Sequence, residues 1–354
     1  MSFEIILPFL PSIAQLILDP EISEVMVNPD GRVFIEKHGT LAPVPCVQLD
    51  KKHLEIAVKN IARRLGDDIS EEKPLLDSRL PDGSRVAAVL PPCSVGGITL
   101  AIRKFHNRWF SVPELVSNGL LTEALAGFLT DSVARRRNLL ISGGTGTGKT
   151  TLMNALASLI PDGARIVLIE DTAEIQLNKP NFVRFEARSP RPGLPAVAIR
   201  DLVRMSLRMR PDRLLVGEVR GREAFDLLQA VNTGHSGTLS TIHANSAIQA
   251  LSKLANYVLE SGVDLPYAAI RGTIAESVNL VVQLERRHAR RIVTELLSVE
   301  GFNHSDDKYE LRTLYQLDAP SSDPISVPSK PPRRARSGYR GRPGGDGELT
   351  ANAE

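Results

Sequence analysis

Apolar positions alternate with polar ones in the first third of the chain. Short alternating runs at 24–28 and 32–36 flank the turn sequence Asn28-Pro-Asp-Gly, and this pattern predicts a strand, a turn and a second strand. Residues 51–64 repeat apolar side chains at helical spacing and predict a helix, and two further strands are expected at 85–90 and 98–104. We therefore expect a small mixed α/β domain at residues 1–104.

Continuous apolar runs replace this alternation further along the chain. After an expected linker at 105–113, runs at 138–142, 165–170, 213–218 and 280–284 alternate with helical segments. Such runs are typical of strands that are buried on both faces, so residues 114–302 predict an α/β domain with a mostly parallel sheet. A C-terminal extension is expected at 303–316. The Pro-, Gly- and Arg-rich residues 317–354 carry too little apolar surface to offset their ordering entropy, and this tail is expected to be disordered.

Composition narrows the class of protein. A chain of 354 residues has room for two domains and a tail. Two cysteines cannot build a disulfide framework or a four-cysteine zinc site, and they favour a cytoplasmic location. Neither a signal peptide nor a membrane-spanning apolar run is expected. With 43 basic and 41 acidic side chains the formal charge is only +2, so the whole chain gives no electrostatic case for a nucleic-acid binder.

One glycine-rich segment carries a specific chemical signal. The run from Gly143 to Thr150 reads Gly-Gly-Thr-Gly-Thr-Gly-Lys-Thr and lies between an expected strand and an expected helix, which is the context of a phosphate-binding loop. Glycines allow backbone N–H groups to converge on phosphate oxygens, the lysine neutralises β- and γ-phosphates, and the final hydroxyl holds Mg²⁺. A glycine-rich turn without a ligand is the alternative. The residues predicted to bind nucleotide are Gly143, Gly144, Thr145, Gly146, Thr147, Gly148, Lys149, Thr150 and Thr151.

Acidic residues follow two of the apolar runs. Because the carboxyl ends of parallel strands lie beside a phosphate loop, we expect Glu218 to orient or deprotonate the attacking water. Glu174 is assigned to a metal-bound water, with Glu170 and Asp171 as supporting acids. Thr150, Glu174 and Glu218 are therefore the candidate metal residues. The alternative is that these acids are solvated caps at strand ends.

Two histidines and a basic helix are further candidates. His235 and His243 lack partners for a metal site and are interpreted as hydrogen-bonding sensors of the γ-phosphate, with structural histidines as the alternative. In the helix expected near 197–209, Arg200, Arg204 and Arg208 recur every four residues. A solvated face is the favoured interpretation, and a subunit contact or phosphate-sensing edge is the alternative.

The order of these motifs resembles that of the secretion (traffic) ATPase superfamily of type II and type IV secretion. The phosphate loop is followed by an acid box at 169–174, an atypical Walker B ending in Glu218, and a histidine box at 234–243. The resemblance covers about residues 10–302 and is greatest to conjugative-transfer ATPases. That likeness rests on Asn28-Pro-Asp-Gly-Arg, Arg79-Leu-Pro-Asp-Gly-Ser-Arg85, Ile102-Arg-Lys-Phe105, Ile169-Glu-Asp-Thr, Leu207-Arg-Met-Arg-Pro-Asp-Arg213 and Gly217-Glu-Val-Arg-Gly221.

The resemblance implies a RecA-like ATPase domain, a preceding N-terminal domain, and bound ATP and Mg²⁺. It implies a cytoplasmic homohexameric ring that powers conjugative type IV secretion or pilus assembly by nucleotide-driven movement of its two domains. Inner-membrane components of such a machine are the expected partners, so a peripheral position at the inner membrane is compatible. By motif match, Arg79, Arg85 and Arg103 are the candidate charge-neutralising arginines, alongside Lys149, Glu218, Glu174, His243 and His235 as catalytic candidates.

Other functions remain open at the level of sequence. A related pilus or type II secretion assembly ATPase is the nearest alternative, although two cysteines cannot supply the four-cysteine zinc element usual in type II enzymes. A nucleotide-gated scaffold would bind ATP with little turnover. A small-molecule kinase would consume ATP only with an acceptor. A nucleic-acid translocase is favoured only by the basic tail, and its ATPase rate would fall steeply with salt.

Overall fold

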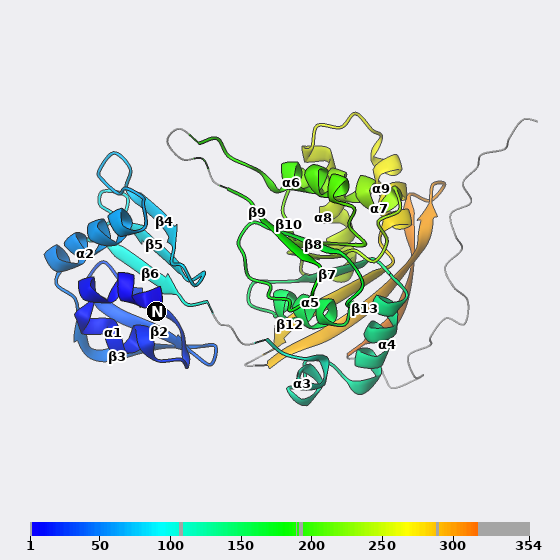
Figure 1. Cartoon of the computed structure of the whole chain (residues 1–354). Coiled ribbons are helices and arrows are strands. Elements are labelled where there is room, and N and C mark those ends of the chain that lie inside the picture. The colour runs from blue at the N-terminus through cyan, green and yellow to red at the C-terminus, as the bar shows by residue number, and fades with distance from the viewer. Residues whose placement is uncertain (1, 106–108, 189, 191–193, 288–289, 318–354) are drawn as a thin grey trace, which may run out of the picture.

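Two β-sheets, each with its own hydrophobic core, organise the chain in this computed structural model (Figure 1). The structure describes residues 2–105, 109–188, 190, 194–287 and 290–317. The expected disordered tail lies outside the described residues except for Leu317.

The first sheet is antiparallel throughout and forms the N-terminal unit. Its strands are in the order β3–β2–β1–β6–β5–β4, with bounds β1 Ile22–Val27, β2 Arg32–Lys37, β3 Thr40–Gln48, β4 Leu75–Arg79, β5 Arg85–Val89 and β6 Thr99–Arg103. Short 3-10 turns at Ser2–Ile5, Leu7–Phe9 and Pro11–Ile13 lead into α1 (Ala14–Leu18), and α2 spans Lys51–Arg64. The side chain of Asp50 caps α2 by accepting the N–H groups of residues 52 and 53.

The second sheet is mostly parallel, as the apolar runs predicted. Its order is β14–β13–β12–β7–β11–β10–β8–β9, and only the β12–β13 and β13–β14 pairs are antiparallel. The strand bounds are β7 Leu139–Gly143, β8 Ile166–Glu170, β9 Phe182–Glu186, β10 Arg213–Val219, β11 Leu239–Ile242, β12 Leu280–Arg287, β13 Arg290–Asn303 and β14 Lys308–Gln316. Residues 303–316, which the sequence assigned to an extension, therefore include a strand of this sheet.

Helices cover both faces of the second sheet (Figure 1). Their bounds are α3 Val112–Ser117, α4 Glu123–Ala134, α5 Lys149–Ser158, α6 Ile199–Ser206, a 3-10 turn at Leu207–Met209, α7 Glu223–Asn232, α8 Ala247–Glu260 and α9 Tyr267–Ser277. Helices α3 to α5 pack on one face and α6 to α9 on the other. Successive residues of β7 alternate between the two cores: Leu139 and Ile141 face α4 and α5, and Leu140 faces the opposite side. Burial on both faces explains why these strands are uniformly apolar.

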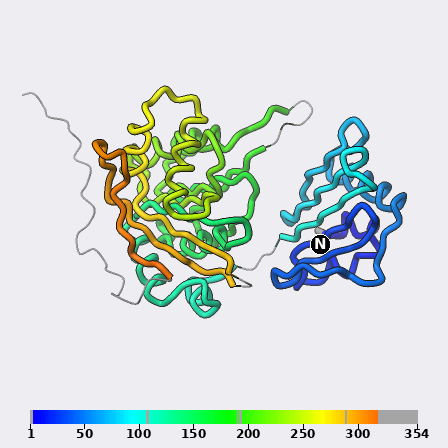
Figure 2. Tube along the Cα trace, turned by 180° about the vertical axis from the view of Figure 1, so that it is seen from behind, coloured from blue at the N-terminus to red at the C-terminus, as the bar shows by residue number. Residues whose placement is uncertain are grey.

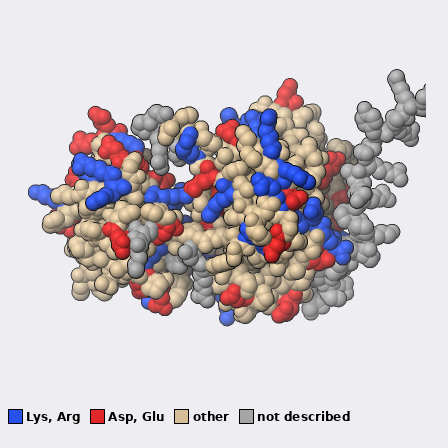
Figure 3. Space-filling view, viewed as in Figure 1, with Lys and Arg blue, Asp and Glu red and all other residues tan. Residues whose placement is uncertain are grey.

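The two units lie side by side in both views of the backbone (Figures 1 and 2). Among the described residues, the contacts that join them include an ion pair between Arg79 and Glu186 and a hydrogen bond from the Arg286 guanidinium to the carbonyl of Gly39. On the face drawn in Figure 3, basic side chains are interspersed with acidic ones. Among the described residues, no helix has both the length and the apolar content needed to cross a membrane.

Candidate active site

The glycine-rich loop connects β7 to α5 at the carboxyl edge of the second sheet. Gly148 precedes α5 with a φ of 97°, a left-handed conformation that a residue without Cβ adopts readily. A Cβ on Gly143 would lie 2.6 Å from the carbonyl oxygen of Leu284, so the strand end also requires glycine. The Thr147 hydroxyl closes the loop by donating to the Gly144 carbonyl at 2.9 Å. The loop backbone is thus held in a curled shape at the N-terminus of α5, where a helix favours anions.

The Lys149 side chain is buried within the glycine-rich loop. Its ammonium donates to the carbonyl oxygens of Gly143 at 3.0 Å and Gly144 at 2.8 Å. Burial lowers the pKa of Lys149, and the charge of Glu218 opposes that shift. A buried ammonium bound only to neutral carbonyls is poorly compensated, and phosphate oxygens would supply the missing negative charge.

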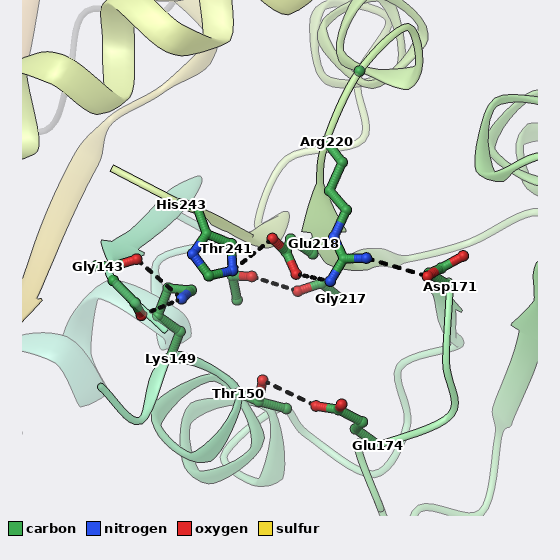
Figure 4. A network of polar contacts seen from close by, with 12 residues as sticks. Gly143, Lys149, Thr150, Asp171, Glu174, Gly217, Glu218, Arg220, Thr241 and His243 are labelled. Atoms are coloured by element: carbon green, nitrogen blue, oxygen red, sulfur yellow. Dashed lines mark hydrogen bonds and ion pairs between the residues drawn. The ribbon is translucent and has the colours of Figure 1, made fainter. Parts of the chain in front are cut away.

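Thr150, which follows Lys149 in α5, and Glu174, which follows β8, are two candidate oxygen ligands that lie close together. The Thr150 hydroxyl lies 3.4 Å from Oε2 of Glu174 (Figure 4). Mg²⁺ prefers oxygen ligands, uses few from the protein and keeps phosphate oxygens and waters. Among the described residues there is no cluster of three or more His, Cys, Asp or Glu side chains that could hold a metal. The pair fits a Mg²⁺ ion that is held mainly by the nucleotide.

Glu170 has a structural position behind the acid box. Its Oε1 accepts the backbone N–H groups of Glu174 and Ile175 at 2.9 and 2.8 Å, and its Oε2 pairs with Arg184 at 2.8 Å. Burial raises the pKa of Glu170 against these hydrogen bonds. The carboxylate therefore fixes the backbone that carries Glu174, and its oxygens already have partners. Its expected role as a supporting acid is indirect.

Glu218 is the centre of a polar network at the carboxyl end of β10 (Figure 4). Its Oε1 is 2.9 Å from Nε2 of His243, which follows the neighbouring strand β11. Its Oε2 accepts from Arg220 at 2.6 Å, and the same guanidinium reaches Asp171 at 3.2 Å. One arginine thereby connects the Walker B acid with the acid box. The hydrogen bond with Glu218 raises the pKa of Arg220.

The surroundings of His243 favour its neutral form. Burial, followed by the charge of Lys149, lowers its pKa, and the charge of Glu218 opposes the shift. A neutral imidazole can donate one N–H to Glu218 and hold that carboxylate in one orientation. His243 therefore contacts Glu218, and its role as a γ-phosphate sensor stays a prediction.

His235 lies at the opposite end of the same strand. It precedes β11, whereas His243 follows it, and four strand residues span on the order of 13 Å. Its Nδ1 is 3.0 Å from the carbonyl oxygen of Ala230. His235 is therefore a backbone-bonded histidine at the end of β11 opposite to His243, which favours the structural alternative, and its role as a γ-phosphate sensor stays a prediction.

The arginines of the basic helix are largely solvated, as expected, but two of them also have a partner. Arg204 and Arg208 are exposed, and Arg200 and Arg204 of α6 both pair with Asp226 of α7, each at 2.7 Å. Asp226 is only 8% exposed. These arginines join two helices behind the sheet, and Arg208 alone of the three has no such contact among the described residues.

The three N-terminal arginines form a row across the first sheet. Arg79 is the register partner of Arg85, which is the partner of Arg103, so the three side chains share one face. Arg79 pairs with Glu186 and Arg85 lies 3.7 Å from Asp77. Within the described ranges, no hydrogen bond or ion pair joins this row to the phosphate loop. Like charges on neighbouring strands repel, so the row favours an anionic partner.

Two contacts of the site were not anticipated from the sequence. Arg220 was part of a family motif without an assigned role, and Arg291 of β13 donates to the Gly146 carbonyl at 3.0 Å from outside the loop. Arg291 is 145 residues away from Gly146 in the chain, and nothing in its local pattern indicates this contact.

Comparisons with known proteins place the chain among secretion-system proteins. The family model for type II/IV secretion system proteins matches residues 10–322. Conjugal transfer protein TrbB of Rhizobium radiobacter is 36% identical over 293 residues, covering 81% of this chain and 86% of TrbB. The PtlH homologue of the type IV secretion system in Bordetella bronchiseptica is 37% identical over 309 residues, 79% of this chain and 91% of that protein. The solved ATPase DotB of Legionella pneumophila, 21% identical with a TM-score of 0.59 over 82% of this chain and 80% of DotB, shares the fold.

Proposed function

This chain belongs to the type II/IV secretion system protein family and is a nucleotide-binding ATPase, and we propose that it is a motor for conjugative type IV secretion or pilus assembly. The observation that carries the proposal is the network of Figure 4, which brings the phosphate loop, the acid box, Glu218 and His243 to one edge of the sheet.

The chain's own residues suit in-line hydrolysis of ATP. Lys149 and the loop hold the β- and γ-phosphates. Glu218, oriented by His243, accepts a proton from water as the water oxygen bonds to the γ-phosphorus. The bond from that phosphorus to the bridging oxygen breaks, and its electron pair stays on ADP. Bound Mg²⁺, held through Thr150 and Glu174, would neutralise phosphate charge.

The arginine row supports a coupling between the two units. Arg79 is held by Glu186 of β9, and the same strand carries Arg184, the partner of Glu170. In our proposal, nucleotide competes for the row as a stronger anion, so its binding and hydrolysis shift one unit against the other. A phosphate shared between two units is the anchor, and its loss releases them.

The ring, its location and its partners complete the proposal. We place the motor in a cytoplasmic homohexamer at the inner membrane, in contact with membrane components of the secretion machine. TrbB and the PtlH homologue carry conjugal transfer and type IV secretion in their names, and this supports that assignment. On the face drawn in Figure 3, basic and acidic side chains are interspersed, so this face gives no support to a nucleic-acid translocase.

Substitutions at Glu218 and Lys149 test the hydrolysis step. Glu218→Gln should lower kcat by about 10²-fold or more and change the Kd for ATP by less than about threefold, because it removes the proton acceptor and leaves the loop intact. Lys149→Ala should weaken ATP binding by about tenfold or more. Steady-state phosphate release and nucleotide titration measure both. Glu276→Gln on the exposed side of α9 is the matched control and should behave as wild type.

Three outcomes would contradict the proposed role of Glu218 or the motor function. Turnover close to wild type in Glu218→Gln would remove Glu218 from its role. Tight ATP binding with almost no turnover in the wild-type chain would replace the motor by a nucleotide-gated scaffold. Turnover that requires an added acceptor would indicate a kinase.

A further inference from the structure

A cavity of about 460 Å³ opens next to the phosphate loop and the catalytic network. Thr145 and His243 line it on the loop side. Its other wall is one face of α8, formed by Gln249, Ser252, Lys253 and Asn256. The cavity thus begins where the terminal phosphate of a loop-bound nucleotide would lie and extends along α8.

The polar wall follows from the amphipathic pattern of α8. The four lining positions are spaced by three and four residues, which places them on one side of the helix. Leu251 and Leu254 lie on the other side and are buried in the core. Side-chain amides, a hydroxyl and one ammonium group therefore face the cavity. They are donors suited to an oxyanion.

Lys253 is the cation of this wall. Among the described residues no carboxylate lies within ion-pair distance of it, and its Nζ is 5.7 Å from the ring centre of Tyr257. Its positive charge contributes to lowering the pKa of both Lys149 and His243. Lys253 is therefore near enough to act electrostatically on the phosphate site.

The N-terminus of α8 adds a favourable field. Asn245 lines the cavity and directly precedes the N-cap Ser246. A 14-residue helix carries partial positive charge at this end, which favours a nearby anion. This partial charge adds to the attraction that the polar side chains of α8 and Lys253 already exert on an anion.

Hydrolysis of ATP would release a phosphate anion next to several carboxylates. The released phosphate is a dianion and leaves a centre that contains three carboxylates, those of Glu218, Asp171 and Glu174 (Figure 4). Arg220 is engaged by the first two of these. A departing anion is repelled by these acids, and Lys253 on α8 is a cation that lies outside their network and lines the adjoining cavity.

We propose that the α8 cavity is a binding site for the inorganic phosphate released by hydrolysis, with Lys253 as its principal cation. This inference rests on the proposed ATPase mechanism, whose γ-phosphate position it uses. The occupant is a phosphate dianion, which could also be the terminal group of uncleaved ATP, and the experiment distinguishes the two sources.

Product inhibition by inorganic phosphate tests the site in the full chain. Lys253→Met should raise the inhibition constant of phosphate by about tenfold, because a charge-assisted contact is lost. Lys253→Arg should restore most of the affinity. The dissociation constants of ADP and of a non-hydrolysable ATP analogue should change by less than about twofold. Lys308→Met, which removes an exposed lysine of β14, is the control and should match wild type in all these constants.

Two results would overturn the assignment. An unchanged phosphate inhibition constant in Lys253→Met would exclude Lys253 from the product site. If Lys253→Met weakens binding of the ATP analogue and leaves the affinities for ADP and phosphate unchanged, Lys253 contacts bound ATP instead.

A second measurement separates this inference from the proposed function. Phosphate is titrated calorimetrically into the wild-type chain and into Lys253→Met, both saturated with ADP and Mg²⁺. If the chain does not hydrolyse ATP but still binds phosphate through Lys253, the phosphate site would be supported and the proposed motor function would be refuted. Normal turnover without phosphate binding to the wild-type ADP complex would do the reverse.

Discussion

Single side chains in this site act through partners that lie far away in the sequence. Glu218 has both carboxylate oxygens engaged, one by His243 and one by Arg220. These two contacts hold the Glu218 carboxylate in one orientation, and in the proposed mechanism such preorganisation is a main source of catalytic stabilisation. Arg220 extends it to Asp171, so a change in the acid box can reach Glu218 through a single guanidinium.

A buried lysine in the N-terminal unit makes stability depend on pH. Lys104 is 9% exposed and donates to the carbonyls of Leu16 and Asp19 at 2.8 and 2.5 Å. Burial lowers its pKa from 10.5 to about 8. Between these values the unfolded chain still binds the proton and the folded chain has lost it, so the free energy of unfolding rises with pH in this window.

Lys104→Met should remove this component of the pH dependence. We expect the free energy of unfolding of wild type to gain about 1 kcal/mol over the variant between pH 8 and pH 9.5. Urea unfolding of both proteins at the two pH values measures it. An identical pH response in the two proteins would show that Lys104 keeps an ordinary pKa.

At the level of elements, the turn before β11 packs closely against a buried arginine side chain. Gly237 lies in the turn before β11 with a φ of 84°, and a Cβ there would come 1.7 Å from the NH1 atom of Arg213. Arg213 is 2% exposed and donates to the carbonyl of Val133 at 2.9 Å. The turn therefore requires glycine for its conformation and for the space that the arginine fills.

Gly237→Ala should destabilise the ATPase unit by about 3 kcal/mol, since the arginine must shift in addition to the backbone strain. Gly262→Ala is the matched control: its φ is 79°, and no atom lies within 4 Å of the position that the added methyl carbon would take. It should cost only about 1 kcal/mol. Denaturant unfolding compares them, and equal losses would show that Arg213 yields without cost.

At the scale of the whole molecule, the contacts found between the described parts of the two units are polar. Arg79 with Glu186 and Arg286 with Gly39 are side-chain contacts on the surface of each unit. Exposed polar pairs contribute about 0–1 kcal/mol, so nucleotide binding has enough energy to rearrange them. This weakness supports the proposed movement of the units.

Ring assembly follows from the proposed function. In the presence of ATP, Glu218→Gln should have a mass six times the 38.6 kDa of one chain, because bound nucleotide persists at every site. Light scattering with and without ATP measures this. A monomer under both conditions would contradict the hexamer.

The last strand of the second sheet ends before the tail begins. Strand β14 ends at Gln316, and the N–H of Leu317 still bonds to Thr294 at 2.9 Å. A chain ending at Leu317 should therefore keep its thermal midpoint and hydrolyse ATP within about twofold of the full chain. Thermal unfolding and ATPase assays check this, and loss of either property would assign the tail to the folded unit.

Local pattern was sufficient for much of this molecule. The helix at Lys51–Arg64, the parallel strands β7, β8, β10 and β12 and the loop at Gly143–Thr150 were predictable because apolar periodicity and glycine chemistry act over a few neighbouring residues. The strand-end position of Glu218 followed from the rule that parallel strands share a carboxyl edge. Strands β9, β11, β13 and β14 of this sheet were not predicted. Of these, β9 and β14 lie at an edge of the sheet and are only partly apolar.

Tertiary structure alone decided which of the candidate side chains meet. His235 and His243 looked equivalent in sequence, yet strand direction separates them and brings only His243 to Glu218. Arg200 and Arg204 are periodic on one helix, but their partner Asp226 belongs to another. The cavity beside Lys253 exists only because α8 packs near the phosphate loop. Sequence spacing encodes neighbours along one element, whereas contacts between elements depend on how the whole sheet is packed.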